Sequence, residues 1–592
     1  MNVDAPRPRS ATPAHAWLNA LETTAAATRD PARTLGRAAE DWAATYGDAP
    51  AVLADIEQFS FRALSERANA YARWALAAGF VGGDVVALMM GGRPDYFALW
   101  LGLSQTGVVV ALLNPNLAGA ALDHCVQVAG ARAAIVEAPF AATCAEAFAG
   151  LDLDLWRYGH GDDARRIDRE MARFSGAALD PAERRATTLA DRALLIFTSG
   201  TTGLPKAAAV SHHRVVAWSH WFAGLADMRA DDRLYDCLPL CHSVGGVAAL
   251  AAALVNGGSV VIAEKFSASG FWRDVARWDC TIFQYIGELC RYLLAAPTSP
   301  DETRHRLRLA CGNGLSADVW RGFVERFGVA QILEFYAATE GNLTLYNVEG
   351  KVGAIGRQPP FLAARDTIAL ARFDAEQQAP WRGPDGFGAR CGVDEVGEAV
   401  GRIGAEPSRR FEGYTEAAET ENKILRDLFA PGDAWMRTGD LMRRDREGFY
   451  YFVDRIGDTF RWKGENVSTR EVAAALSGAP GVKEAIVYGV AVPHADGKAG
   501  MAALVVEGAP DLAVIAWAAS ALPRYARPLF LRLRPALEAT ATFKPVKRAL
   551  VAEGFDPVKL IDPLYVYDAE REAYVALDAE RFAAIVNGDA RL

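Results

Sequence analysis

A run of glycine and hydroxyl residues that ends in a lysine is the segment of this sequence best suited to chemistry. It follows a short apolar stretch at residues 194–197 and consists of Thr198, Ser199, Gly200, Thr201, Thr202, Gly203, Leu204, Pro205 and Lys206. Glycines let backbone N–H groups point inward, and hydroxyl and ammonium groups add charge-assisted donors, so the run predicts a phosphate-binding loop. It is not a Walker A loop, because only two residues separate its glycines and two more precede the lysine. The alternative interpretation is a turn rich in threonine and glycine that binds no ligand.

A second segment, residues 335–342, combines an aromatic ring, a hydroxyl group and a carboxylate. Tyr336 can stack on a nucleotide base, Thr339 can reach a phosphate, and Glu340 can hold a magnesium ion that bridges phosphates. Magnesium is the expected ion because carboxylate and phosphate oxygens are hard ligands. The alternative is a helix start that Thr339 caps.

These two segments resemble the adenylate-forming superfamily, which contains acyl-CoA synthetases, luciferases and adenylation domains of peptide synthetases. The resemblance implies that ATP, Mg²⁺ and CoA take part in the reaction and that Glu340 is the metal ligand. Further matching segments imply that Gly312, Asn313 and Gly314 form a loop against the adenine ring and that His242 lines the acyl pocket. They also imply that Asp440 binds the ribose, that Arg455 contacts ribose or phosphate, and that Gly464 lies in the pantetheine channel. Locally, His242 could equally be a packed core histidine, and Asp440 and Arg455 could belong to surface turns with salt bridges.

Residues 540–544 resemble the C-terminal segment of the family that carries its catalytic lysine, which here is Lys544. Ala541 stands where the family usually has glycine, and glycine is the more permissive residue for the backbone. Lys547 is the rival assignment, and Lys544 is preferred.

Four further segments resemble the fatty acid transport protein branch of the superfamily: residues 284–293, 459–469, 553–557 and 562–565. That branch contains long-chain and very-long-chain acyl-CoA synthetases, which couple fatty acid uptake to thioester formation. The resemblance therefore implies an ATP-dependent fatty acid–CoA ligase that acts through an acyl-adenylate. The alternatives are a ligase of the same superfamily for an aryl or short-chain acid, and a non-enzymatic accessory of fatty acid uptake.

The elements that must position these segments alternate between helix and strand. Hydrophobic patterns predict a helix at residues 61–78, a strand at 85–90, a helix at 98–105 and a strand at 108–113. Such alternation indicates βαβ units and a mostly parallel sheet, so the fold class is α/β. Residues 377–392 are expected to form a loop.

Beyond residue 455 the pattern is that of a smaller α/β unit. It predicts helices at residues 469–476 and 512–522 and strands at 484–490 and 502–506. We therefore expect a large ATP- and acyl-binding domain over residues 1–456. A small, mobile C-terminal domain over residues 457–592 is expected to carry the catalytic lysine.

Composition restricts the partners and the location. The net charge of −10 argues against nucleic-acid binding. The eight cysteines form no C-x-x-C pair, and Cys237, Cys241 and His242 lack the further ligands of a zinc cluster. The apolar runs at residues 96–113 and 243–263 are interrupted by polar residues and glycines and are expected to be buried helices followed by strands. The expected partners are a fatty acid, ATP and CoA. The expected location is the cytoplasm, and peripheral contact with the inner face of the plasma membrane is left open. The oligomeric state is also left open.

Overall fold

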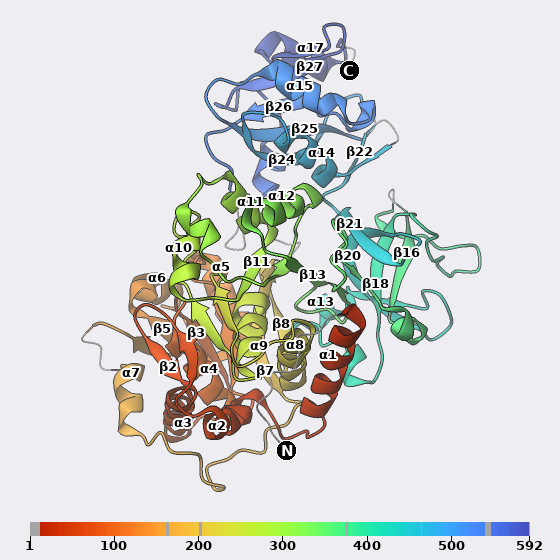
Figure 1. Cartoon of the computed structure of the whole chain (residues 1–592). Coiled ribbons are helices and arrows are strands. Elements are labelled where there is room, and N and C mark those ends of the chain that lie inside the picture. Colours follow the sequence, from red (N-terminus) through yellow and green to blue (C-terminus); the bar gives the residue numbers. More distant parts are fainter. Residues whose placement is uncertain are drawn as a thin grey trace. The chain divides into compact units, whose positions relative to one another are not determined.

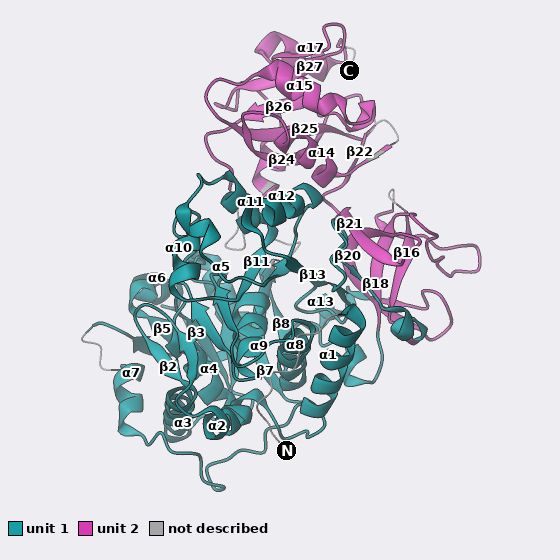
Figure 2. Ribbon diagram, viewed as in Figure 1, with its two compact units in different colours: residues 1–364, 403–424 teal, residues 365–402, 425–592 magenta. Residues whose placement is uncertain are grey.

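The computed structural model of the chain (Figure 1) describes residues 12–161, 165–199, 204–374, 377–462, 465–495, 497–538 and 546–590. The chain divides into two compact units, shown in Figure 2. Unit 1 comprises residues 1–364 and 403–424, and unit 2 comprises residues 365–402 and 425–592. These units are defined by compactness, and the domain boundary that we expect between residues 456 and 457 stays a prediction.

Unit 1 contains a six-stranded sheet that ends in a hairpin. Its order is β6 (Asp154–Tyr158), β5 (Ala131–Glu137), β3 (Val85–Met89), β4 (Val109–Leu112), β7 (Arg192–Ser199) and β8 (Pro205–Ser211). The first five strands are parallel, and β7 and β8 are antiparallel. Along β3, Val86 and Leu88 enter one core, while Val85 and Ala87 enter the core on the opposite face. This two-residue period explains why the strand is apolar on both sides.

A second sheet of unit 1 provides the edge at which ligands are expected. Its order is β2 (Gln58–Ser60), β1 (Pro50–Leu53), β10 (Ser259–Ile262), β9 (Arg233–Asp236), β11 (Ile282–Ile286), β12 (Leu309–Asn313), β13 (Gln331–Ala337), β14 (Thr344–Asn347) and β15 (Gly356–Arg357). Six neighbouring strands of this sheet are parallel to one another: β1, β10, β9, β11, β12 and β13. The predicted mostly parallel sheet is thus confirmed, and its carboxyl edge is where ligands of open α/β sheets bind.

Helices of unit 1 pack between the two sheets and on their outer faces (Figure 1). The inner core joins side chains of both sheets to α1 (Pro13–Ala27), α2 (Leu35–Tyr46), α3 (Phe61–Ala77), α4 (Pro94–Gln105), α8 (His212–Leu225) and α9 (Leu250–Leu254). Helices α5 (Gly119–Ala129) and α6 (Ala141–Ala147) cover the outer face of the six-stranded sheet. Helix α10 (Phe271–Arg277) packs Phe271 on Phe283 of β11, and α11 (Gly287–Ala295) and α12 (Ala317–Phe327) lie on the same side.

The apolar run at residues 243–263 forms a π-helix (Ser243–Ala249), then α9 and then β10, which confirms the prediction of a buried helix followed by a strand. Two glycines let the π-helix approach its own preceding loop. A Cβ atom on Gly246 would lie 1.7 Å from the carbonyl oxygen of Leu240.

Among the helices of the described residues, none has both the length and the apolar character that a membrane span requires.

Unit 2 contains an antiparallel sheet and the smaller C-terminal α/β domain. The antiparallel sheet has the order β17 (Ala379–Pro380), β16 (Ile368–Asp374), β18 (Gly397–Arg402), β20 (Ala434–Arg444) and β21 (Phe449–Arg455). The C-terminal domain has the sheet order β24 (Val482–Ala491), β25 (Lys498–Val506), β26 (Phe530–Leu533), β27 (Leu564–Asp568) and β28 (Ala573–Ala576). Its helices are α14 (Thr469–Ser477), α15 (Leu512–Ser520), α16 (Arg548–Glu553) and α17 (Ala579–Asn587), and β22 (Phe460–Trp462) pairs with β23 (Glu465–Val467). The fold is therefore α/β, with a large N-terminal and a smaller C-terminal domain.

Candidate active site

The carboxyl edge of the second sheet gathers three of the segments that the sequence singles out. His242 follows β9, the Gly312–Asn313–Gly314 loop begins at the end of β12, and Tyr336 lies near the end of β13, with Thr339 just beyond it. Ser243, at the start of the π-helix, places its Oγ atom 3.0 Å from Oγ1 of Thr339. Segments that are almost one hundred residues apart in sequence are thus joined by a hydrogen bond at this edge.

The loop predicted to face adenine is held by a buried carboxylate that the sequence analysis missed. Glu334, on β13, accepts hydrogen bonds from the backbone N–H groups of Gly314 (2.6 Å) and Leu315 (3.1 Å). The hydroxyl group of Tyr285 donates to its other oxygen at 2.5 Å. Gly312 has no room for a side chain, because a Cβ atom there would lie 2.2 Å from the Tyr285 carbonyl oxygen. The available signal for Glu334 was a single acidic residue among the apolar residues of the strand.

The predicted phosphate loop is the connection of the β7–β8 hairpin. Thr198 and Ser199 end β7, Lys206 lies near the start of β8, and Thr198 and Lys206 are cross-strand partners. Gly200, Thr201, Thr202 and Gly203 lie outside the described residues. Lys206 forms an ion pair with Glu419, and its Nζ atom lies 5.8 Å from the centre of the Tyr414 ring.

Glu340 lies beside the hairpin and has two partners from residues 409–423 of unit 1. The Nζ atom of Lys423 is 3.9 Å from its Oε1 atom. The hydroxyl group of Tyr414 forms hydrogen bonds with both Glu340 and Thr198. Burial raises the pKa of Tyr414, and the Glu340 charge raises it further, so the phenol stays protonated and can donate.

The surroundings of Glu340 fit a magnesium ion that is bound mainly by its substrate. Among the described residues, no cluster of three or more His, Cys, Asp and Glu side chains exists. Magnesium commonly takes one or two protein carboxylates and completes its shell with phosphate oxygens and water. Glu340 would supply one such carboxylate, with the Thr339 hydroxyl group next to it in sequence.

A buried arginine supports the chain directly after Glu340. Arg214, on α8, donates through Nη2 to the carbonyl oxygen of Gly341 at 2.5 Å. Burial lowers the pKa of Arg214, and the charges of Glu412 and Glu340 oppose this shift. No hydrogen-bond acceptor of the described part of the chain reaches its Nη1 atom. No motif in the sequence distinguishes this arginine from the many others.

His242 is half-buried at the entrance of the π-helix. Its backbone N–H donates to the Pro239 carbonyl oxygen at 3.2 Å, and its own carbonyl oxygen accepts from Gly246 at 2.7 Å. The neighbouring Cys241 is buried, and burial raises its pKa to about 12, so its thiol is protonated at neutral pH.

In unit 2, Asp440 and Arg455 are cross-strand partners on β20 and β21. The Arg455 Nε atom lies 3.5 Å from Oδ1 of Asp440. The β20 backbone just before Asp440 is held by Glu398, a fully buried residue that the sequence analysis missed. Glu398 accepts from Arg437 Nη2 at 2.8 Å and from the Gly439 backbone N–H at 3.2 Å.

Lys547, the rival for the catalytic lysine, is engaged within unit 2. Its Nζ atom donates to Thr469 Oγ1 at 2.6 Å and lies 3.3 Å from Oδ2 of Asp458. Asp454 accepts from the Thr469 backbone N–H at 2.6 Å and thereby holds the same helix start. Lys544 and Gly464 lie outside the described residues, so their predicted roles stay predictions.

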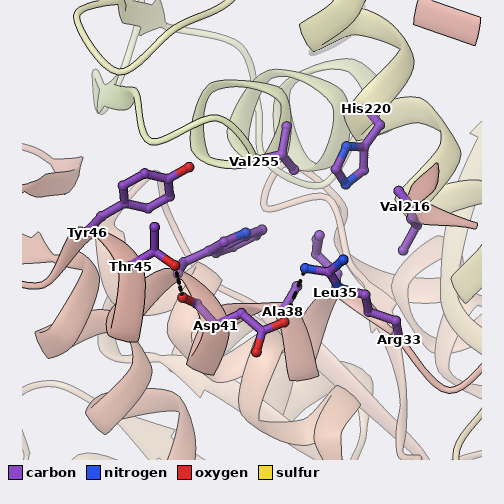
Figure 3. A pocket seen from close by; sticks show the side chains of 11 residues that line it. Arg33, Leu35, Ala38, Asp41, Thr45, Tyr46, Val216, His220 and Val255 are labelled. Carbon is purple, nitrogen blue, oxygen red and sulfur yellow. Dashed lines mark hydrogen bonds and ion pairs between the residues drawn. The ribbon is translucent and has the colours of Figure 1, made fainter. Parts of the chain in front are cut away.

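A cavity of about 120 Å³ lies apart from all of these residues, between α2, α8 and the end of α9 (Figure 3). Val216, His220 and Val255 line it from one side, and the Arg33–Asp41 ion pair lies at its edge. It is smaller than the roughly 150 Å³ cavity that holds a benzene molecule, so it has no room for a long acyl chain.

The sequence matches two family descriptions. Residues 39–365 match the AMP-binding enzyme family, and residues 471–544 match the AMP-binding enzyme C-terminal domain. The second match ends at the segment that carries Lys544.

Curated relatives and a solved structure agree with these matches. Long-chain fatty acid transport protein 1 of Mus musculus is 43% identical over 546 residues, which cover 90% of this chain and 84% of the relative. Long-chain fatty acid transport protein 2 of Rattus norvegicus is 37% identical over 95% of this chain and 92% of the relative. The crystal structure of ATP-bound MatB from Rhodopseudomonas palustris has a TM-score of 0.73 at 24% identity, over 87% of this chain and 98% of that chain. At that identity the structural likeness bears on the fold alone.

Proposed function

The chain belongs to the AMP-binding enzyme family, and within it we propose that it is an ATP-dependent ligase that joins long-chain or very-long-chain fatty acids to CoA. The observation that carries the proposal is the 43% identity to a long-chain fatty acid transport protein over 90% of the chain. The arrangement of Thr339, Glu340 and Lys206 in unit 1 supports it, because these groups suit a bound triphosphate. The names of the relatives also support a coupling of the reaction to fatty acid uptake.

In the first half-reaction, a carboxylate oxygen of the fatty acid attacks the α-phosphorus of ATP. The bond from that phosphorus to the bridging oxygen breaks, and pyrophosphate leaves. No side chain has to remove a proton, because the acid is already ionised at neutral pH. Both reactants are anionic, so the residues must offset their repulsion.

Lys206 and the hairpin loop are proposed to hold the phosphates, and Thr339 the α-phosphate. Glu340 would hold Mg²⁺, which supplies charge neutralisation between the phosphate oxygens when bound. Tyr336 and the Gly312–Asn313–Gly314 loop are proposed to contact adenine, Asp440 and Arg455 the ribose, and His242 the acyl group. The hydrogen bonds of Glu334 keep the adenine-facing loop in one conformation, which reduces the cost of ordering it on binding.

In the second half-reaction, the CoA thiol attacks the carbonyl carbon of the acyl-adenylate and AMP leaves. We propose that the C-terminal domain moves between the two steps, withdrawing Lys544 and presenting Gly464 to the pantetheine arm. One mobile domain would then serve two chemical steps.

A panel of acids tests the substrate class. The full chain is incubated with ATP and magnesium, and pyrophosphate release is measured with palmitate, oleate, a very-long-chain acid, acetate and benzoate, with and without CoA. We expect release with the long acids and formation of their CoA thioesters. Activity with acetate or benzoate alone would favour a different ligase of the family, and no release with any acid would favour a non-enzymatic role.

A further inference from the structure

Residues 409–423, here called the strap, lie along strand β8 of unit 1. The backbone N–H of Ala209 donates to the Gly413 carbonyl oxygen, and that of Thr415 donates to the Ala207 carbonyl oxygen, both at 3.0 Å. Ala208 and Tyr414 form an antiparallel bridge, so the strap continues the six-stranded sheet beyond β8. Glu412 fixes the far end of this contact by accepting hydrogen bonds from the Ser211 N–H and hydroxyl groups at 2.7 and 2.5 Å.

The strap places an opposite charge on the two charged side chains of unit 1 that the proposed function assigns to the triphosphate or its metal. Glu419, in the short helix α13 (Ala417–Glu421), pairs with Lys206, and Lys423 pairs with Glu340. These side chains are 11% and 22% exposed in the first pair and 26% and 13% exposed in the second. The pairs are therefore largely shielded from water, where the attraction between charges is stronger than at an exposed surface.

The same geometry implies competition when a nucleotide enters. Lys206 cannot bind a phosphate oxygen fully while it is paired with Glu419, and the carboxylate of Glu419 would repel the incoming phosphates. Lys423, in contrast to Glu419, would favour nucleotide binding. Once a metal ion neutralises Glu340, the ammonium group of Lys423 is repelled by the metal and attracted by the phosphate oxygens.

We propose that the strap exchanges ionic partners when ATP binds. Glu419 is the counter-ion that holds Lys206 in the absence of nucleotide and weakens ATP binding, and Lys423 is a second cation for the phosphates. This inference rests on the proposed function, because it requires the triphosphate to occupy the site between Lys206 and Glu340.

Calorimetric titration of the full chain with ATP and magnesium tests the proposal through binding alone. We expect Glu419→Gln to bind ATP about three- to tenfold more tightly and Lys423→Met about tenfold more weakly than the wild type. With EDTA in place of magnesium, Lys423 remains on Glu340, so Lys423→Met should differ from the wild type by less than about twofold.

A matched ion pair elsewhere in unit 1 supplies the control. Arg73 and Glu183 have nearly the same exposure as Lys206 and Glu419, 12% and 29%, and lie outside the site. Glu183→Gln should leave ATP affinity within about twofold of the wild type, and thermal unfolding checks that all variants fold. If Glu419→Gln and Lys423→Met both weaken binding, or if neither changes it, the strap is only structural and the proposal is overturned. A wild-type chain that takes up no ATP would instead overturn the proposed function itself.

Discussion

At the scale of single residues, the loop that we propose to contact adenine depends on Glu334. Its carboxylate accepts three hydrogen bonds, from Tyr285 and from the N–H groups of Gly314 and Leu315. In glutamine the amide oxygen can still accept from the two backbone N–H groups, but the NH2 group then faces the Tyr285 hydroxyl group, and the negative charge that strengthens all three bonds is lost. We expect Glu334→Gln to raise the KM for ATP about tenfold, with a smaller change in kcat, because hydrogen bonds to charged groups contribute about 1.5–3 kcal/mol each.

Steady-state kinetics and thermal unfolding of Glu334→Gln and Tyr285→Phe check this prediction. Tyr285→Phe removes one donor and leaves the two backbone bonds of Glu334 in place, so its effect on the KM should be smaller. An unchanged KM for ATP in Glu334→Gln would show that the loop does not need this carboxylate.

His212 makes the stability of the fold depend on pH. It is buried at the start of α8, and burial lowers its pKa from 6.5 to about 4, with Asp191 opposing the shift. Between these two values the unfolded chain binds a proton that the folded chain does not. The contribution of the neutral His212 to the free energy of unfolding is therefore fully present above pH 6.5 and is lost as the pH falls toward 4. At pH 5 the loss from this one group is about 2 kcal/mol. Urea unfolding at pH 7.5 and pH 5 should show a smaller loss in His212→Gln than in the wild type, and equal losses would contradict the assignment.

The residues that could be predicted from sequence are those in contiguous motifs. Thr198, Lys206, Thr339 and Glu340 stand in short segments whose residue types already suit phosphate and metal. Glu334, Glu398, Glu419 and Arg214 act on partners many residues away. Their selection requires the strand register and the path of the strap, which a hydrophobic pattern does not contain.

At the scale of elements, the hydrophobic pattern located the cores of strands and helices better than their ends. The helix predicted at residues 61–78 is α3 (Phe61–Ala77), and the strand predicted at 85–90 is β3 (Val85–Met89). The helix predicted from residue 98 begins at Pro94, because proline fits the first helical turn. Strand β8 was not predicted, and neither was the π character of the helix at Ser243–Ala249, since the alanines and glycines of both segments carry little periodicity.

The π-helix gives a prediction about packing. A Cβ atom on Gly246 would overlap the Leu240 carbonyl oxygen, so Gly246→Ala must displace either the π-helix or the loop that carries His242. We expect the free energy of unfolding to fall by about 1–3 kcal/mol. The KM for the fatty acid should increase more than the KM for ATP. Thermal unfolding and kinetics check this, with Gly82→Ala as the control, because a Cβ atom there meets nothing within 4 Å. Equal behaviour of the two variants would contradict the close packing.

At the scale of the whole molecule, the proposed reaction uses one mobile C-terminal domain for two chemical steps. Both family matches are present in one chain, and the C-terminal match ends at Lys544. Lys547 contacts Thr469 and Asp458 of its own unit, and Lys544 stays the predicted lysine that reaches the nucleotide. The two half-reactions should therefore respond differently to changes in these two lysines.

We expect Lys544→Ala to slow adenylate formation by about two orders of magnitude, because a donor to the charge that develops in the transition state is lost. Thioester formation from preformed acyl-AMP and CoA should change far less, since the proposed domain movement withdraws Lys544 before that step. Lys547→Ala removes the contacts with Thr469 and Asp458, so it should lower the stability of unit 2 and affect both half-reactions to a similar extent. Separate assays of pyrophosphate release and of acyl-AMP consumption distinguish the two variants. Equal losses in both half-reactions for Lys544→Ala would mean that this lysine supports the fold, and a selective loss of adenylation in Lys547→Ala would transfer the catalytic role to Lys547.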